Sequence, residues 1–423
     1  MSASTDLPAK FDPSDPASFA NPYPGLARLR EHDPLHFDPH LRAWFVTRYD
    51  DNKALTQNLA LSSDRLRPFF GSLADDRRRD IASIIRYLSR WMVFTDPPEH
   101  TRLRKLASSA FGVRRMNAMG PLIERRVHRL LDGLQGRREI DFIAEFAGPL
   151  PALVIMDMLG VPEAELARVK ALSDRVALFI GSARLTPDKY AVAEAATREL
   201  ADYFLGLVAA RRGHPTQDLV SDLIAARDPE NGDALTDDEL VATCILLLFA
   251  GHETTTSLLS GGLLALLAFP EQIERLRAQP ALAADAVEEF LRYDGPNLSQ
   301  ARVVAEPVEL HGKTMKPGER VFLMLAAANR DPAVFERPDE LDIACERAPH
   351  LAFGWGRHIC LGFPLARLEA TIAFPALLAR WPAITRATDT LDWHASMVFR
   401  GVSAMPLQLD WHAGHRGRPH QRQ

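Results

Sequence analysis

Ten residues near the C-terminus, FGWGRHICLG at positions 353 to 362, have the types and spacing to hold a metal cofactor. Glycines at 354 and 356 permit a tight backbone. Cys360 shortly precedes Pro364, which suits the first turn of a helix, so the helix dipole would favour the thiolate. Gly362 would let a large, flat group approach the backbone. A single thiolate beside an open face is the type of proximal ligand that an iron porphyrin uses.

Two other interpretations of Cys360 are open from its residue type alone. A lone cysteine is commonly a buried structural thiol. A zinc site could combine Cys345, His350, His358 and Cys360, although these residues lack the paired short spacings of structural zinc sites. The ten-residue pattern around Cys360 favours the cofactor interpretation over both. Three cysteines in all are too few and too scattered for a disulfide framework.

A second stretch, LLLFAGHETTTSLL at 246 to 259, places polar residues at the centre of an apolar helix. Ala250 and Thr254 are four residues apart and therefore share one helix face, and Gly251 has no side chain to block it. The Thr254 hydroxyl can donate to the Ala250 carbonyl, which tends to bend a helix. Glu253 can titrate and pass protons. For the following residues, Thr255, Thr256 and Ser257, satisfied packing within the helix is the better interpretation.

These motifs together resemble the cytochrome P-450 family. FGWGRHICLG contains all six fixed positions of the haem-binding loop F-G-x-G-x-H-x-C-x-G. AGHETT, residues 250 to 255, is similar to the oxygen-activation motif, and EFLR, residues 289 to 292, matches E-x-x-R. The family marks follow the family's order from about residue 90 to 405. The resemblance implies a mainly α fold with a small β part, in which a long central helix crosses over haem b.

The resemblance also implies roles for individual residues. Cys360 would be the axial ligand of the haem iron, and Thr254 and Glu253 would be catalytic. The expected cofactor-binding residues are His100, Arg104, Ala250, Gly251, Arg302, Phe353, His358, Cys360 and Gly362. Among these, His100, Arg104, Arg302 and His358 would bind the haem propionates. Glu289 and Arg292 would form a structural ion pair, whose third partner is open between Arg337 and Arg347 because Glu340 stands where an arginine is common.

The elements that must position these residues are mostly helices. Thr236 and Glu239 form a predicted capping box, and Pro270 ends the helix that they begin, giving a length of roughly 50 Å. A strand is expected in 41–51, and a helix is expected after it. Amphipathic helices are expected at 121–134, 145–160, 192–212 and 216–227. We expect a single haem domain over 1–411 and a disordered basic tail over 412–423.

The composition is that of an ordinary enzyme, with 47% hydrophobic residues, 25% charged residues and a net charge of −5. It gives no reason to expect nucleic acid or an anionic membrane as a partner. The polar, proline-rich start has no signal or anchor pattern, so a cytoplasmic protein is expected, and a monomer is the expected state. The apolar halves of the central helix are each too short to cross a bilayer.

The predicted function is that of a haem-thiolate monooxygenase that inserts one oxygen atom from O₂ into a hydrophobic small molecule, in secondary metabolism or catabolism. By family position, the substrate pocket draws on Trp91–Phe94, Leu178–Ile180, Phe249, Leu298 and Met397–Phe399. Electrons are expected from a ferredoxin and its NAD(P)H-dependent reductase, because no flavin or iron–sulfur domain is fused. The alternatives are a peroxide-driven peroxygenase, whose known relatives tend to lose the acid–alcohol pair, and a non-catalytic haem sensor.

One surface feature bears on the electron donor. Four basic residues lie on or near the segment that contains His100: Arg102, Lys105, Arg114 and Arg115. They form either a solvated face or a docking patch for an acidic electron-transfer protein, and the sequence does not separate the two. Arg90 and Arg400 are expected to be structural or solvent-facing rather than substrate contacts.

Overall fold

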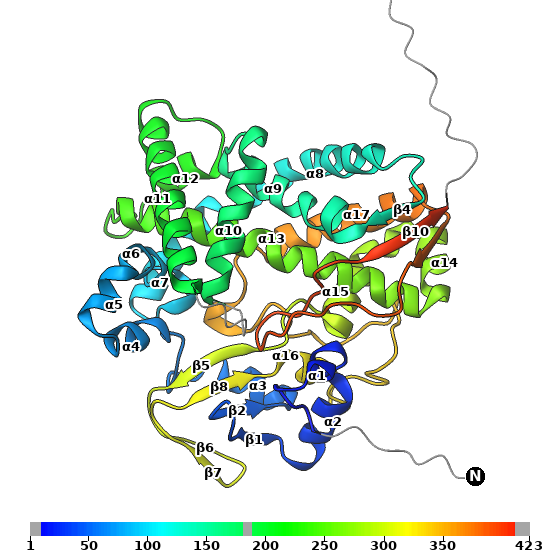
Figure 1. Ribbon diagram of the computed structural model, residues 1–423, viewed down its shortest axis with the longest axis horizontal. Coiled ribbons are helices and arrows are strands. Elements are labelled where there is room, and N and C mark those ends of the chain that lie inside the picture. The colour runs from blue at the N-terminus through cyan, green and yellow to red at the C-terminus, as the bar shows by residue number, and fades with distance from the viewer. Residues whose placement is uncertain (1–9, 181–187, 411–423) are drawn as a thin grey trace, which may run out of the picture.

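The computed structural model describes residues 10–180 and 188–410, so the predicted tail at 412–423 lies outside the described residues. The helices are α1 Pro16–Ala20, α2 Tyr23–His32, α3 Tyr49–Leu55, α4 Leu66–Gly71, α5 Asp75–Asp80, α6 Ala82–Leu88, η1 Met92–Phe94, α7 Glu99–Ala110, α8 Val113–Gly133, η2 Ile143–Ala147, α9 Pro149–Leu159, η3 Glu163–Glu165, α10 Leu166–Ile180, α11 Lys189–Gly213, α12 Leu219–Ala225, α13 Asp237–Ala268, α14 Pro270–Ala278, η4 Pro280–Leu282, α15 Ala283–Asp294, α16 Leu325–Ala328, η5 Gly356–His358 and α17 Phe363–Arg380. The strands are β1 Leu35–Asp38, β2 Ala43–Val46, β3 Leu61–Ser62, β4 Glu139–Asp141, β5 Gln300–Val304, β6 Val308–Leu310, β7 Lys313–Met315, β8 Arg320–Leu323, β9 Ala383–Arg386 and β10 Pro406–Asp410. The expectation of a mainly α fold with a small β part is confirmed (Figure 1).

Helix α13 runs through the middle of the helical part (Figure 1). Its predicted start is confirmed, because Thr236 Oγ1 accepts from the Glu239 N–H at 3.3 Å and Glu239 Oε2 accepts from the Thr236 N–H at 2.9 Å. As expected, the helix ends just before Pro270, at Ala268, and Pro270 begins a further helix, α14. Among the described helices, α13 alone is long and apolar enough to cross a membrane, but 67% of its most apolar window is buried inside the protein. It is the core helix around which the fold is built.

Other helices pack around α13 and bury it. Helices α6, α9, α10, α11, α15 and α17 all contact it. Helix α9 lies close to α13 at Gly251, where a Cβ would come within 2.8 Å of Ile155 Cγ1. Glycine at this position therefore lets the two helices approach closely.

Five of the described strands form a sheet of order β1-β2-β8-β5-β3, which lies with α1 to α3 below α13 in Figure 1. Strands β2 and β8 are parallel, and the other pairs in this sheet are antiparallel. The strand expected in 41–51 is β2, and α3 follows it as predicted. A second sheet of order β4-β10-β9 and the hairpin β6-β7 complete the β part.

The four expected amphipathic helices are present, but their bounds differ from the predicted ones. Helix α8 begins at Val113 and includes Pro121, the residue that was expected to start it, because Met116 and Met119 extend its buried face. The helix expected at 145–160 is interrupted, and η2 ends at Ala147 before α9 begins at Pro149. Helix α12 is shorter than expected, whereas α11 covers the whole of 192–212.

Candidate functional site

A large cavity lies between the middle of α13 and the loop that precedes α17. All nine predicted cofactor-binding residues line this cavity: His100, Arg104, Ala250, Gly251, Arg302, Phe353, His358, Cys360 and Gly362. Both predicted catalytic residues, Glu253 and Thr254, line it as well. The fold thus brings together residues that are up to 262 positions apart in the chain, from His100 to Gly362.

Cys360 presents its thiol to this cavity. Its backbone N–H donates to the Phe353 carbonyl at 2.9 Å, which closes the loop. Gly354 and Gly356 have φ angles of 73° and 69°, a region that side chains other than glycine rarely adopt. A Cβ on Gly362 would meet nothing closer than Cys360 Sγ at 4.0 Å, so this face of the loop is open to a flat group.

Opposing effects act on the Cys360 thiol. Burial raises its pKa, whereas the N–H groups of Gly362 and Phe363 at the start of α17 and the nearby Arg104 lower it. The net direction is upward, so the helix start alone does not produce the thiolate that was expected from it. A bound cation would be needed to hold the thiolate form, which fits a metal ligand.

The zinc alternative is wrong. His350 Nε2 lies 3.2 Å from Glu288 Oε2, and the Cys345 thiol donates to the neighbouring Glu346 carbonyl. Neither residue lines the cavity that contains His358 and Cys360. Among the described residues, the only group of three potential metal ligands lies elsewhere.

Positive and neutral donors line one end of the cavity, and none of them has a carboxylate partner within the described chain. The imidazole rings of His100 and His358 lie 4.0 Å apart, and His100 Nδ1 is buried without a partner. Burial lowers the pKa of His100 to about 4 and that of His358 to about 2, with nearby cations adding to the effect. Burial also lowers the pKa of Arg302 to about 10. Such a donor set suits a ligand that brings two carboxylates.

Arg65 is a further cation in this cavity that the sequence analysis missed. Its guanidinium lies 4.9 Å from the centre of the Phe94 ring. Burial, together with the charge of Arg302, lowers its pKa to about 10. Arg65 follows a serine-rich turn with no motif around it, so no local signal marked it.

Residues from the middle of α13 form another part of the cavity wall. Thr254 Oγ1 donates to the Ala250 carbonyl at 3.0 Å, so the predicted hydrogen bond is present. Thr255 and Thr256 donate to the Gly251 and His252 carbonyls at 3.3 and 2.8 Å, which agrees with their expected packing role. Gly251 lines the cavity, but the space that its missing Cβ leaves is filled by Ile155 of α9.

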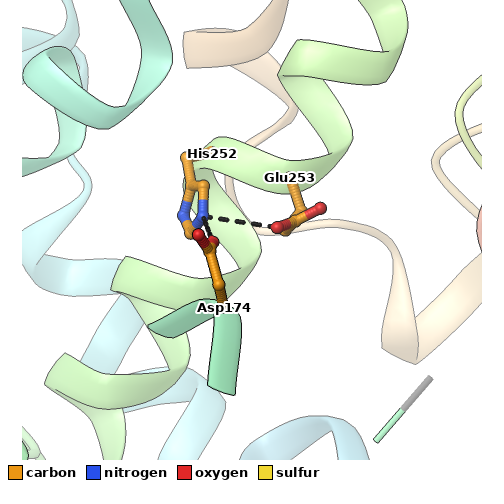
Figure 2. Close-up of side chains that lie close together, drawn as sticks. All are labelled: Asp174, His252 and Glu253. Carbon is orange, nitrogen blue, oxygen red and sulfur yellow. Dashed lines mark hydrogen bonds and ion pairs between the residues drawn. The ribbon is translucent and has the colours of Figure 1, made fainter. Parts of the chain in front are cut away.

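His252 was not singled out by the sequence, yet it joins Glu253 to α10. Figure 2 shows the carboxylates of Asp174 and Glu253 both close to the same nitrogen of the His252 ring. Its Nε2 lies 3.4 Å from Asp174 Oδ1 and 3.5 Å from Glu253 Oε1. Burial raises the pKa of Glu253, but the hydrogen bond and charge of His252 outweigh this effect, and the net pKa is lowered.

The apolar part of the cavity only partly matches the predicted substrate pocket. Trp91–Phe94, Ile180, Phe249, Val398 and Phe399 line it, whereas Leu178, Phe179, Leu298 and Met397 do not. Leu298 instead packs into the core cluster of the N-terminal helices and the large sheet. Phe179 packs against aromatic rings of α4. Arg90 and Arg400 bind Asp238 and Asp294, in agreement with structural roles.

The structural pair Glu289 and Arg292 is buried, and its third partner is Arg347. Arg292 Nε lies 2.7 Å from Glu289 Oε2, and Arg347 Nη2 lies 3.1 Å from Glu289 Oε1. Arg337, the other candidate, binds the exposed Glu340. The triad links α15 to the segment before the cysteine loop.

The basic residues beside His100 do not form a free docking patch. Arg102 binds Asp233 and Glu239, and Lys105 binds Asp228 and Glu230. Arg115 is likewise paired, with Asp222. The side chain of Arg114 lies outside the described residues. Their partners belong to α12, to the segment between α12 and α13 and to the first turn of α13, so these charges hold α7 and α8 in place.

The family model described as "Cytochrome P-450" matches residues 190–394. The chain is 38% identical over 395 residues to the biotin biosynthesis cytochrome P-450 of Bacillus subtilis, covering 92% of this chain and 96% of that protein. It is 40% identical over 396 residues to the vitamin D(3) 25-hydroxylase of Pseudonocardia autotrophica, covering 92% and 94%. The crystal structure of CalO2 superposes with a TM-score of 0.87 at 31% identity, covering 95% and 99% of the two chains.

Proposed function

The chain belongs to the cytochrome P-450 family and is a haem b monooxygenase, and from this premise we propose that it oxidises a hydrophobic small molecule with electrons from a ferredoxin and its reductase. One observation carries this proposal. One largely apolar cavity is lined both by Cys360, from the loop before α17, and by Thr254, from the middle of α13. An organic substrate in that cavity lies where oxygen is activated.

We propose that Cys360 is the axial ligand of the haem iron. When bound, haem supplies the one-electron and O₂ chemistry that no amino-acid side chain provides. The open backbone at Gly362 leaves space for a flat ring. The haem propionates would be bound by His100, Arg104, Arg302 and His358, and the support for this assignment is their shared lack of a carboxylate partner among the described residues. Ala250, Gly251 and Phe353 complete the expected cofactor contacts.

Thr254 and Glu253 are proposed to manage protons on the α13 side. The Thr254 hydroxyl donates to the Ala250 carbonyl at 3.0 Å. Its oxygen can at the same time accept a hydrogen bond from a donor in the cavity. Glu253 is ionised and lines the cavity, so it can accept a proton from solvent and release it inward. This pair favours oxygen activation by O₂ and electrons over the peroxide-driven and sensor alternatives, which do not need it.

The proposed substrate is hydrophobic because of the residues around the remaining space. Trp91, Phe94 and Phe249 form a stacked aromatic group with ring centres 5.6 to 5.9 Å apart. Phe399 contacts Phe249 at 6.1 Å in an edge-to-face arrangement. Such rings bind apolar carbon skeletons and offer few hydrogen bonds to orient polar groups. The substrate's identity is to be found by screening compounds for a spectral shift of the ferric haem.

The proposed electron donor is a ferredoxin that docks near the cysteine loop. Two cations lie at this loop: Lys53, over the Trp355 ring at 4.3 Å, and Arg357, which donates to the Gln57 carbonyl. Neither forms an ion pair among the described residues, so both are available to an acidic partner, unlike Arg102 and Lys105. Contact between exposed charges is screened over about 8 to 10 Å at ordinary ionic strength.

A reconstitution experiment tests the proposed function. The purified holoenzyme is incubated with a hydrophobic compound selected by spectral shift, NADPH, a ferredoxin and its reductase, and oxygen uptake and product are measured. We expect product to form only with both electron-transfer proteins, and its rate to fall at high salt. Equal turnover with hydrogen peroxide alone would favour the peroxygenase. Turnover with NADPH alone would contradict the proposed electron donor.

A further inference from the structure

The buried imidazole of His252 has a partner on each of its nitrogens. The side chain is 2% exposed, and its Nδ1 lies 2.8 Å from the Leu248 carbonyl oxygen. A carbonyl oxygen only accepts, so Nδ1 must carry a hydrogen. In the neutral ring, Nε2 would then turn a bare lone pair toward the carboxylates of Asp174 and Glu253 (Figure 2). The imidazolium has a hydrogen on both nitrogens, so it donates from Nδ1 to the Leu248 carbonyl and from Nε2 to Asp174, and its positive charge forms the ion pair with Glu253.

We propose that His252, kept in the imidazolium form by Asp174 of α10, is the positioning residue that holds the Glu253 carboxylate at the edge of the cavity. This inference rests on the proposed role of Glu253 in proton supply. The three residues form a clamp, Asp174–His252–Glu253, that ties α10 to α13 beside Thr254. Asp174 is 44% exposed, His252 is buried and Glu253 is 33% exposed, so the clamp extends from the surface to the cavity.

The charges around the clamp favour its ionised form. Burial lowers the pKa of His252, but the hydrogen bonds to Asp174 and Glu253 outweigh it and raise the pKa to about 9. Lys170, one turn before Asp174 on α10, binds both Asp174 oxygens at 2.9 and 3.1 Å. Helix α9 faces α13 here with the apolar Ile155. Within the described residues, the ion pairs of this cluster involve only Lys170, Asp174, His252 and Glu253.

A divalent cation is the competing occupant, because the three ligand atoms lie within 4.8 Å of one another. One observation and one chemical argument favour a proton on His252 Nε2 over a bound metal ion. Lys170 already occupies the Asp174 oxygen that faces His252. In addition, a metal ion would take the lone pairs of Glu253, leaving it unable to pass protons.

The sign of the pH dependence follows from the raised pKa. The clamp is fully formed below the ordinary histidine pKa of about 6.5 and is lost as pH rises through about 9. Removing the Asp174 charge lowers the pKa of His252, so the clamp is then lost at a lower pH. The Glu253 carboxylate would then no longer be held at the edge of the cavity by His252.

The test is a titration of His252 in the holoenzyme. The reduced carbon monoxide complex is diamagnetic, so ¹⁵N-histidine resonances can be followed by NMR from pH 6 to 10, with His252→Gln used for assignment. We expect an imidazolium at pH 7 and a pKa that falls by at least one unit in Asp174→Asn. Asp174→Glu should largely restore the raised pKa of His252. Glu165→Gln, which removes a carboxylate that binds Arg168 beside the start of α10, serves as the matched control and should leave it unchanged.

Activity provides the second readout. In Asp174→Asn, the alkaline limb of the plot of product per NADPH against pH should move to lower pH, while KM for substrate stays within twofold. A neutral His252 at pH 7 in the wild-type enzyme would overturn the inference. If Glu253→Gln slows product formation but the pH profile is unmoved in Asp174→Asn, the inference about His252 is overturned, while the proposed role of Glu253 stands.

Two further outcomes are distinguished by Glu253→Gln and by the addition of zinc. An unchanged rate in Glu253→Gln would refute the proposed proton supply, and positioning by His252 would fall with it. Loss of the His252 titration on adding one equivalent of ZnCl₂, with recovery on adding EDTA, would overturn the imidazolium clamp in favour of a metal site. Without that effect of zinc, the titration supports the clamp.

Discussion

Replacing Thr254 with alanine tests the oxygen side of the proposed site. The variant loses the 3.0 Å hydrogen bond to the Ala250 carbonyl, whose net value is about 0.5–1.5 kcal/mol. Alanine regains roughly 0.5 kcal/mol through its better helix propensity, so stability should change by less than about 1 kcal/mol. Haem content and substrate affinity should therefore remain close to those of the wild type.

The effect on product formation should be much larger than the effect on stability. A hydrogen bond that the Thr254 hydroxyl oxygen accepts from a charged donor in the cavity is worth about 1.5–3 kcal/mol. At 1.36 kcal/mol per factor of ten, its loss should change the ratio of product to released peroxide by about 10- to 100-fold. The assay measures product, NADPH oxidised and hydrogen peroxide in the same reaction.

Two variants separate this role from a loss of packing. Thr254→Ser keeps the hydroxyl and should retain most of the coupling. Thr256→Ala removes a hydroxyl from the same helix that contacts the His252 and Ala147 carbonyls but does not line the cavity. It should cost about 1 kcal/mol of stability and leave coupling intact. Unchanged coupling in Thr254→Ala, or an equal loss in Thr256→Ala, would refute the reasoning.

Three further predictions concern the cofactor ligand and the core. Cys360→Ser should abolish the thiolate-type absorption of the reduced carbon monoxide complex, whereas Cys345→Ser should keep it; the reverse result would show that the ligand is misassigned. Glu289→Gln should lower the free energy of unfolding by about 3–5 kcal/mol because it leaves two buried guanidinium groups without their carboxylate, while the neighbouring, half-exposed Glu288→Gln should cost no more than about 1 kcal/mol in the same urea titration. Gly251→Ala should cost about 1–3 kcal/mol because its Cβ meets Ile155, and a double-mutant cycle with Ile155→Ala should show that the two costs are not additive.

Much of the site could be predicted because its signals are local. The cysteine loop depends on glycines at fixed spacing, and Gly354 and Gly356 do adopt positive φ angles. The start of α13 depends on Thr236 and Glu239, three residues apart. The hydrogen bond from Thr254 to the Ala250 carbonyl follows from helix geometry alone. In each case, the interacting groups lie within a few residues of one another, so the sequence contains the whole interaction.

Interactions between distant segments could not be predicted in the same way. Arg347 completes the Glu289 triad across 58 residues, and the sequence offered Arg337 equally. Arg102 appeared to be a candidate for a docking patch because its partner, Glu239, is 137 residues away. Arg65 reaches the cavity only through the fold of the segment before α4. Charge type is visible in a sequence, but the partner that neutralises the charge is set by tertiary packing.

His252 combines a position in a local motif with a partner that is distant in the sequence. It occupies the variable position of the motif A/G-G-x-D/E-T-T/S, where the family pattern imposes no residue type. The structure gives this position a partner, Asp174, 78 residues earlier on α10. An apolar side chain at 252 would leave the carboxylates of Asp174 and Glu253 close together without the imidazolium that contacts both, and each carboxylate would raise the pKa of the other. The residue type at 252 is therefore determined by α10 rather than by the motif, and a change at 174 should require a compensating change at 252.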